Sequence, residues 1–199
     1  MEAKKEKVII GRSFFARNSL EVARDILGYV LVRESPEGKT SGIIVEVEVY
    51  RGEDDPASFA YKGKTKRSEP LYGSPGIAFV YLTYGMYYLL NIITEKENFP
   101  AAILIRAVEP LEGVELMKKR RKTDNIYNLA SGPGKLTQAF DITLSLNGTD
   151  MTLPSSLLYI GEKKLEVKEV VWRPRIGIKE GIDRLWRVYI KNNPFISRK

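Results

Sequence analysis

The sequence predicts an α+β fold: a single domain with a mainly antiparallel, curved sheet, flanking helices and a projecting β-hairpin. Three observations predict it. The chain has 199 residues, 43% of them hydrophobic, which is enough for one sizeable core. It contains no internal repeat, low-complexity linker or shift in composition that would mark a domain boundary. Its short strand-like segments follow one another with turns between them, and strands joined in this way usually pair antiparallel.

The N-terminal region is expected to hold an arm and two helices. Residues 1–12 are mostly charged and are predicted to be an arm on the single domain formed by residues 13–199. A short helix follows, and apolar residues at helical spacing then predict a longer helix over 18–27. Asn18 or Ser19 is the expected N-cap of that longer helix.

The other elements are predicted from β-branched runs, turn residues and helical spacing. Strands are expected over 29–33, 42–50, 77–82, 87–94, 101–108 and 187–190, and helices over 111–122 and 135–140. Turn residues at 35–38 and 83–86 predict two hairpins. The segment 51–76 is polar, rich in Gly and Pro and aperiodic, and a loop of this length inside a compact domain is usually functional or disordered.

The absence of two residue types excludes several kinds of chemistry. The chain contains no Cys and no His. Without Cys there is no disulfide, thiolate nucleophile or Cys-based zinc site, and without His there is no Ser-His-Asp triad or His-ligated metal. Acid–base chemistry must therefore use Asp, Glu, Lys or Tyr.

The charge balance favours a polyanionic partner. The 32 Lys and Arg outnumber the 25 Asp and Glu, which gives a net charge of +7 and a pI of about 9.4. Nucleic acid is the leading candidate partner. No apolar run approaches the roughly 20 residues of a membrane span, and the N-terminus lacks the features of a secretory signal. We therefore expect no membrane association and a cytoplasmic location.

The strand over 42–50 carries the first candidate site. Alternation places Glu46, Glu48 and Tyr50 on one face of this strand. Periodicity alone favours a half-buried strand with a solvated acidic face. In a chain without His or Cys, however, one of these carboxylates is the natural candidate for a general base.

Tyr84 is the second candidate, because it lies at the expected tip of the hairpin over 77–94, beside Gly85. A large aromatic side chain at an exposed tip of a basic protein suggests a wedge between bases. The alternative is a Tyr that packs across strands, as we expect for Tyr87 and Tyr88. The turn argument leaves both interpretations of Tyr84 open.

Arg106 is the third candidate, because it interrupts an apolar strand. A buried Arg needs a carboxylate, a phosphate or another acceptor. Arg106 therefore either pairs structurally with a Glu, Glu48 being one such partner, or lines a polar site.

Two basic clusters, at 62–67 and 118–122, could contact phosphates. A solvated helix end explains such runs equally well, because cations are favoured at a helix C-terminus. The segment 131–135 resembles a phosphate loop but lacks its full spacing, so we reject a nucleoside triphosphate site.

Taken together, these segments resemble the alkyladenine (3-methyladenine) DNA glycosylase family. The resemblance covers about residues 14–197; each motif alone is moderately specific, whereas the motifs in the family's order are very specific. Its motifs are at 44–50, 55–58, 80–86, 90–91, 105–113, 131–136, 174–178 and 187–190, followed by Pro194.

The resemblance implies an enzyme that flips damaged purines, such as 3-methyladenine and 7-methylguanine, out of DNA and hydrolyses their N-glycosidic bonds. It implies that Glu48 is the general base, and that Arg106 and the backbone carbonyl of Ile176 hold the attacking water. Tyr84 would fill the gap in the duplex, with Met86 beside it. No cofactor or metal is required, and no residue matches a Lys nucleophile, so a monofunctional hydrolase of N-glycosyl compounds acting on double-stranded DNA is expected. Nothing in the sequence indicates an obligate oligomer, so we expect a monomer.

The implied base pocket contains a departure from the family's pattern. Tyr50 and Tyr81 would sandwich the flipped base, and Asn91 would obstruct the 2-amino group of normal guanine. The family usually has His after its Pro-Ala-Ser motif, where this chain has Phe59. Phe59 keeps the stacking and the backbone N–H but loses any side-chain hydrogen bond. We therefore expect a preference for cationic alkylated bases over neutral ones such as hypoxanthine. The loop at 65–70 also departs from the Thr-Pro-Arg-Asn pattern of the family.

Three other kinds of protein would share part of this set of residues. A module that binds distorted DNA without catalysis would not need Glu48 and Arg106, which are both present. A glycosylase of altered, hypoxanthine-type specificity would share these residues. An RNA-binding domain on a related fold would share the basic surface but not the pocket residues.

Overall fold

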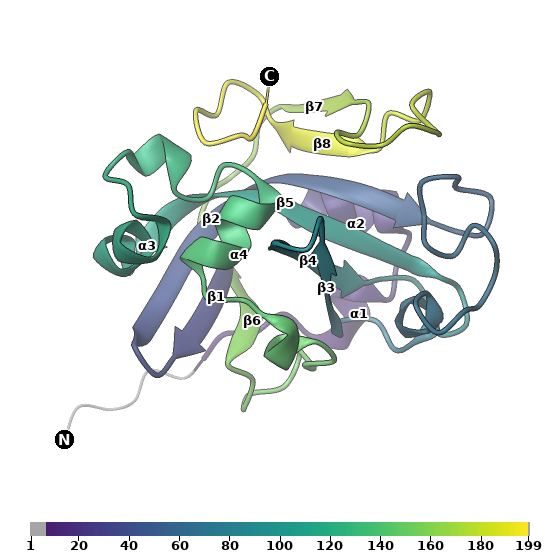
Figure 1. The fold of residues 1–199 in the computed structure, drawn as a ribbon, viewed down its shortest axis with the longest axis horizontal. Helices are drawn as coiled ribbons and strands as arrows, with labels where there is room; N and C mark the ends of the chain where they lie inside the picture. Colours follow the sequence, from purple (N-terminus) through teal and green to yellow (C-terminus); the bar gives the residue numbers. More distant parts are fainter. Residues whose placement is uncertain (1–6, 199) are drawn as a thin grey trace.

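One antiparallel sheet organises the part of the chain that the computed structural model describes, residues 7–198 (Figure 1). Within these residues eight strands form the sheet in the order β3-β4-β5-β2-β1-β6, with β8 pairing β2 and β7 pairing β8. Every strand pair is antiparallel. The strands are β1 (Tyr29–Ser35), β2 (Gly38–Arg51), β3 (Ala78–Thr83), β4 (Tyr87–Ile93), β5 (Ala101–Glu112), β6 (Leu158–Lys163), β7 (Val170–Arg173) and β8 (Arg187–Ile190). The predicted fold class is confirmed.

The helices are short and flank the sheet. They are α1 (Arg12–Phe15), α2 (Ser19–Asp25), α3 (Val114–Arg121) and α4 (Pro133–Ala139), with 3-10 turns at Glu69–Tyr72, Ile126–Asn128 and Leu144–Leu146. Asn18 caps α2 as predicted, because its side chain accepts a hydrogen bond from the N–H of Leu20 at 2.9 Å. The long segment between β2 and β3 is irregular apart from one 3-10 turn, as expected.

Predicted boundaries are wrong in two places: tertiary pairing explains those at residues 109–113, and the fixed φ of proline explains the start of α4. The strand expected over 101–108 continues to Glu112, because residues 109–112 pair with the start of β2. The helix expected from residue 111 therefore begins only at Val114, after Gly113 turns the chain at φ 71°. At α4 the helix begins at Pro133, inside the predicted turn, because the fixed φ of proline suits a first helical turn.

A disturbance in β2 bends the sheet beside the candidate carboxylates. The register between β2 and β5 shifts on both sides of Glu46. Such bulges increase local twist and often re-aim side chains next to active sites. β8 pairs with β2 over the same stretch, Glu46 to Glu48. Three strands therefore meet where the acidic residues lie.

The core occupies the space between the sheet and its helices, with a smaller core beneath the loop between β2 and β3. Phe15, Ile44, Leu90, Ile103 and Phe140 are among its fully buried side chains. The smaller core contains Ala60, Leu71, Phe79, Ile93 and Ala102. The loop between β2 and β3 is thus packed onto the domain by apolar contacts of its own.

The N-terminal arm lies partly outside the described residues, which begin at Lys7. Lys7 pairs with Glu34 at 2.9 Å, and the N–H of Ile10 donates to the carbonyl of Ile160 at 3.0 Å. The division of the chain at residue 12 stays a prediction. Among residues 7–198 no helix has the length and apolar character needed to cross a membrane.

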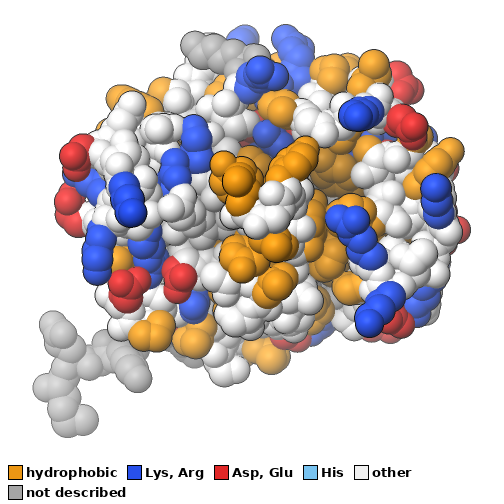
Figure 2. Space-filling view, viewed as in Figure 1, with side chains coloured by type: hydrophobic (Ala, Val, Ile, Leu, Met, Phe, Trp, Pro, Cys, Tyr) orange, Lys and Arg blue, Asp and Glu red, His pale blue; other side chains and the backbone are white. Residues whose placement is uncertain are grey.

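The β3–β4 hairpin projects from the sheet and carries exposed apolar side chains. Figure 2 shows hydrophobic side chains gathered near the middle of this face, with Lys and Arg around them. Tyr84 is 82% exposed and Met86 is 66% exposed. The predicted projecting hairpin is therefore present.

Candidate active site

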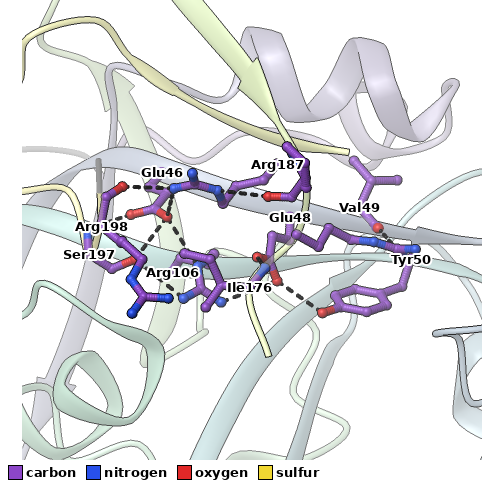
Figure 3. Close-up of polar contacts among 11 residues, drawn as sticks. Glu46, Glu48, Val49, Tyr50, Arg106, Ile176, Arg187, Ser197 and Arg198 are labelled. Atoms are coloured by element: carbon purple, nitrogen blue, oxygen red, sulfur yellow. Dashed lines mark hydrogen bonds and ion pairs between the residues drawn. The ribbon is translucent and has the colours of Figure 1, made fainter. Parts of the chain in front are cut away.

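Two buried glutamates on β2 share one arginine on β5 (Figure 3). Glu46 and Glu48 are both fully buried, and Arg106 is 5% exposed. The Nε of Arg106 donates to Oε1 of Glu46 at 3.1 Å, and its Nη1 lies 3.2 Å from Oε2 of Glu48. The solvated acidic face that periodicity favoured is therefore wrong. A buried charge is stable only when it is paired and hydrogen-bonded, and the positive charge of Arg106 provides that pairing.

Glu48 is held on both of its carboxylate oxygens. Its Oε2 accepts from the hydroxyl of Tyr50 at 2.9 Å, and its Oε1 accepts from the backbone N–H of Ile176 at 2.6 Å. Burial raises the pKa of Glu48 above its ordinary value, while the charge of Arg106 and these two hydrogen bonds act in the opposite direction. A carboxylate with a raised pKa is suited to accept a proton at neutral pH.

A second buried ion pair anchors the segment that brings Ile176 to the site. Arg175 and Asp55 have fully buried side chains and form a bidentate pair at 2.6 and 2.7 Å. Arg175 also donates to the carbonyl of Val49 at 2.9 Å, and its guanidinium lies 4.7 Å from the ring centre of Tyr50. The pair joins the loop after β2 to the segment before β8, so Ile176 and Tyr50 are positioned together.

These groups form one side of a cavity of about 600 Å³. Tyr50, Arg106 and Ile176 line it directly, and Glu48 lies behind them, bonded to all three. The family resemblance implied that these four residues share one site, and the structure brings them together. The backbone N–H of Ile176 is the group that contacts Glu48, and the role of its carbonyl stays a prediction.

The opposite side of the cavity is aromatic. Phe59 packs edge-on against Tyr81, with ring centres 4.9 Å apart, and Tyr81 contacts Phe79 at 5.3 Å. Burial raises the pKa of Tyr81 to about 12, so its hydroxyl stays protonated. Asn91 also lines the cavity, and its side-chain amide donates to the carbonyl of Phe79 at 3.3 Å. Phe59, Tyr81 and Asn91 therefore surround the same cavity as Tyr50.

The hairpin tip lies at the edge of this cavity. Tyr84 is one of the lining residues, whereas Met86 is not among them. Tyr84 adopts a left-handed conformation at φ 51°, followed by Gly85 at φ 68°. Two successive positive φ angles are typical of the tight turns that join hairpin strands. The turn holds the Tyr84 ring away from the sheet, so the cross-strand packing alternative is wrong for this residue.

The two basic clusters differ in their surroundings. In the 118–122 cluster, Lys118 pairs with Glu115 at 2.7 Å, and Arg120 pairs with Glu37 at 2.9 Å. Arg121 instead lines the cavity, together with Lys135 from α4. In the 62–67 cluster, the Arg67 guanidinium lies 4.0 Å from the ring centre of Phe59. One residue of each cluster thus reaches the cavity.

Sequence reasoning did not assign site roles to four residues that the structure places around this centre. Arg187 donates to Glu46 at 3.0 Å, Ser197 donates to it through both its N–H and its hydroxyl, and Arg175 pairs with Asp55. These partners are separated by more than 100 residues along the chain, and no local pattern connects them. An Arg within the apolar strand 187–190 was the one available signal, of the kind that identified Arg106.

An aromatic cavity with a buried carboxylate, beside an exposed aromatic hairpin tip on a basic domain, is typical of a class of proteins that bind a planar ligand. Residues 13–194 match the family described as Methylpurine-DNA glycosylase (MPG), and the chain belongs to this family. The predicted family resemblance is confirmed.

Relatives of nearly the same length carry one name, "Putative 3-methyladenine DNA glycosylase". The protein from Methanocella arvoryzae is 49% identical, covering 96% of this chain and 96% of the relative. The protein from Prosthecochloris aestuarii is 46% identical, covering 94% and 90%, and that from Carboxydothermus hydrogenoformans is 45% identical, covering 96% and 100%. Family membership implies a hydrolase of the N-glycosylase class that binds DNA.

Proposed function

We propose that this protein removes alkylated purines, such as 3-methyladenine and 7-methylguanine, from double-stranded DNA and leaves an abasic site. The observation that carries the proposal is the placement of Glu48. It is a buried carboxylate with a raised pKa, directly behind a cavity with aromatic walls, in a chain without His or Cys. Cavities of this kind, apolar with a few convergent polar groups, are typical ligand sites.

In the proposed reaction a water molecule attacks the anomeric carbon of the flipped nucleotide. The new C–O bond forms as the C–N bond to the purine breaks, and the electron pair of that bond neutralises the cationic base. Glu48 takes the proton of the water. Its carboxylate also stabilises the positive charge that develops on the sugar. Arg106 and the carbonyl of Ile176 hold the water, as the family resemblance implies.

The aromatic wall and the hairpin supply the binding steps in this proposal. Tyr50, Phe59 and Tyr81 stack on the extruded base, and Asn91 excludes the 2-amino group of normal guanine. Tyr84, with Met86 beside it, fills the space that the base leaves in the duplex. Extrusion costs a few kcal/mol and is least costly for a damaged base, which adds selectivity. We further propose that the enzyme is monofunctional and acts as a cofactor-free monomer in the cytoplasm.

A base-release assay tests the proposal. Duplex DNA that contains 7-methylguanine is incubated with the wild type, Glu48→Gln or Glu109→Gln, and the released base is measured under single-turnover conditions. Glu109 is a carboxylate on β5 that bonds Asn193 and does not line the cavity, so it is a matched control. We expect a loss of at least about 100-fold for Glu48→Gln, the usual contribution of a general base. We expect wild-type rates for Glu109→Gln.

Three results would contradict the proposal or part of it. Wild-type protein that binds methylated duplex but releases no base would favour the non-catalytic binding module. Base release by Glu48→Gln at the wild-type rate would show that another group activates the water. Strand cleavage by the wild type at the abasic site would overturn the monofunctional assignment.

A further inference from the structure

Glu46 has no role in the proposed reaction, yet it is extensively hydrogen-bonded. Its Oε1 accepts from Nε of Arg106 at 3.1 Å, from Nη1 of Arg187 at 3.0 Å and from the hydroxyl of Ser197 at 2.8 Å. Its Oε2 accepts from the backbone N–H of Ser197 at 2.6 Å. Figure 3 shows these groups on the side of Arg106 away from Tyr50. Of these four bonds, one comes from β5, one from β8 and two from the C-terminal segment.

All three nitrogens of the Arg106 guanidinium have a defined partner. Nε donates to Glu46, and Nη2 donates to the Ser197 hydroxyl at 3.3 Å. Nη1 lies 3.2 Å from Glu48. A guanidinium is planar and rigid, so two fixed nitrogens determine the position of the third. The contacts on Nε and Nη2 therefore aim Nη1 at the candidate base.

We propose that Glu46 and Ser197 are positioning residues that hold Arg106 against Glu48, so that the C-terminal segment of the chain completes the active site. This inference rests on the proposed function for its effect on catalysis. Ser197 lies beyond residue 194, where the match to the family ends. The Ser197 hydroxyl receives a hydrogen bond from Arg106 and donates one to Glu46, so it closes a triangle among the three residues.

Glu46 also contributes to the charge balance around Glu48. The buried cluster holds two carboxylates, Glu46 and Glu48, and two guanidinium groups, Arg106 and Arg187. The other titratable groups close to Glu48 are Tyr50 on β2, Tyr81 on β3 and Arg175 beside Tyr50. The negative charge of Glu46 supports the raised pKa of Glu48, to which burial contributes most. Removing that charge lowers the pKa of Glu48.

Four variants test the inference by kinetics. Ser197→Ala removes the hydroxyl and Ser197→Thr restores it, while Glu46→Gln removes the charge. Glu112→Gln is the control for a carboxylate-to-amide change, because Glu112 on β5 pairs with Lys39 at 2.8 Å, away from the cavity and from the C-terminal segment. We expect single-turnover base release to slow about fivefold in Ser197→Ala, the equivalent of one hydrogen bond. Binding to an abasic-site duplex should be unchanged, and Ser197→Thr should recover most of the rate. In Glu46→Gln the acid limb of the pH–rate profile should move to lower pH.

A second measurement does not depend on catalysis. The NMR signals of the Arg106 Nη2 protons, whose partner is the Ser197 hydroxyl, should be protected from exchange in the wild type and in Glu112→Gln, and should lose protection in Ser197→Ala. A ¹³C titration of Glu48 should show a lower pKa in Glu46→Gln. If the wild type releases no base, the proposed function fails, and these two NMR readouts still decide whether Arg106 is positioned in this way.

Three results would overturn the inference. The first is base release at the wild-type rate by Ser197→Ala, which would mean that the Ser197 hydroxyl does not position Arg106, whatever its effect on thermal stability. The second is an unchanged exchange rate at Arg106 in Ser197→Ala. The third is an unchanged Glu48 pKa in folded Glu46→Gln. If Glu46→Gln does not fold, the two variants Ser197→Ala and Ser197→Thr decide whether Arg106 is positioned in this way. Both should fold, because Ser197 is only partly buried and neither change leaves an unpaired charge.

Discussion

The two sides of the cavity are built differently. The charged side takes its side chains from the middle of the sheet, where Glu48 and Arg106 lie on neighbouring strands and are joined by short polar contacts. The aromatic side takes Phe59 from the loop between β2 and β3 and Tyr81 from the projecting hairpin, and its rings meet edge-on. Hydrogen bonds have strict geometry, whereas ring contacts tolerate a range of angles.

This difference separates the groups that would carry out the chemistry from those that would bind the base. The groups that would carry the chemistry are held by ion pairs among strands that cannot move independently, which keeps reacting atoms within the small tolerances of catalysis. Phe59, one of the groups that would contact the base, lies on a loop that packs on its own small core and is attached to the sheet by apolar contacts. A residue of the aromatic side can therefore differ from the family's pattern, as Phe59 differs from the usual His, without changing the contacts of the charged side.

The largest expected effect tests whether the charged side is rigidly anchored. Asp55→Asn breaks the buried pair with Arg175 and leaves a buried guanidinium without its counter-charge. We expect a loss of about 3–5 kcal/mol in the free energy of unfolding, measured by urea denaturation. The neighbouring Asp54 is a matched control, because its side chain is 77% exposed where it pairs with Arg184. Asp54→Asn should cost at most about 1 kcal/mol. Equal losses in the two variants would mean that the buried pair does not anchor this region.

The rate of base release should depend on pH through the pKa of Glu48. If Glu48 is the base, its carboxylate form is active, so the rate falls as pH drops through its raised pKa. The hydroxyl of Tyr50 stabilises that carboxylate by a hydrogen bond and lowers its pKa. Tyr50→Phe should therefore move the acid limb of the pH–rate profile to higher pH by about one unit, since a bond to a charged group contributes about 1.5–3 kcal/mol and a unit is about 1.4 kcal/mol. A shift to lower pH would assign the limb to another group.

The sequence predicts the residues of the charged side better than it predicts the distant contacts that hold those residues in place. Alternation along 42–50 places Glu48 and Tyr50 on one face, because strand geometry is local and periodic, and the apolar surroundings of Arg106 predict an acceptor such as Glu48. The family resemblance then places the three residues in one site. The bond from Ile176, the Asp55–Arg175 pair and the contacts of Ser197 depend on how distant segments meet, and no local signal encodes them. The boundary error at 109–113 has the same origin, since pairing with β2 overrides the helical pattern.

A smaller effect is expected on the aromatic side. The preference for cationic over neutral bases that we attribute to Phe59 should weaken in Phe59→His, where a side-chain hydrogen bond to the base becomes possible. One hydrogen bond corresponds to about a fivefold change in the ratio of hypoxanthine release to 3-methyladenine release. The measurement compares single-turnover rates on two otherwise identical duplexes. An unchanged ratio would remove Phe59 as the source of specificity.

The smallest predicted effect distinguishes two roles of Arg67: a charge beside the bound base, and a contact with a DNA phosphate. Its guanidinium stacks on Phe59 and lines the cavity, so it places a positive charge near a cationic base. Arg67→Ala should then raise the release of 7-methylguanine relative to hypoxanthine by about two- to fivefold, the scale of an exposed cation–π contact. Lys64→Ala is the control, because Lys64 pairs with Glu69 outside the cavity. If Arg67 contacts a phosphate instead, its loss should weaken binding to both substrates equally and reduce the salt dependence of binding, without changing their ratio. That second result would move Arg67 from the aromatic wall to the DNA-binding surface, and Phe59 and Tyr81 would set base specificity without it.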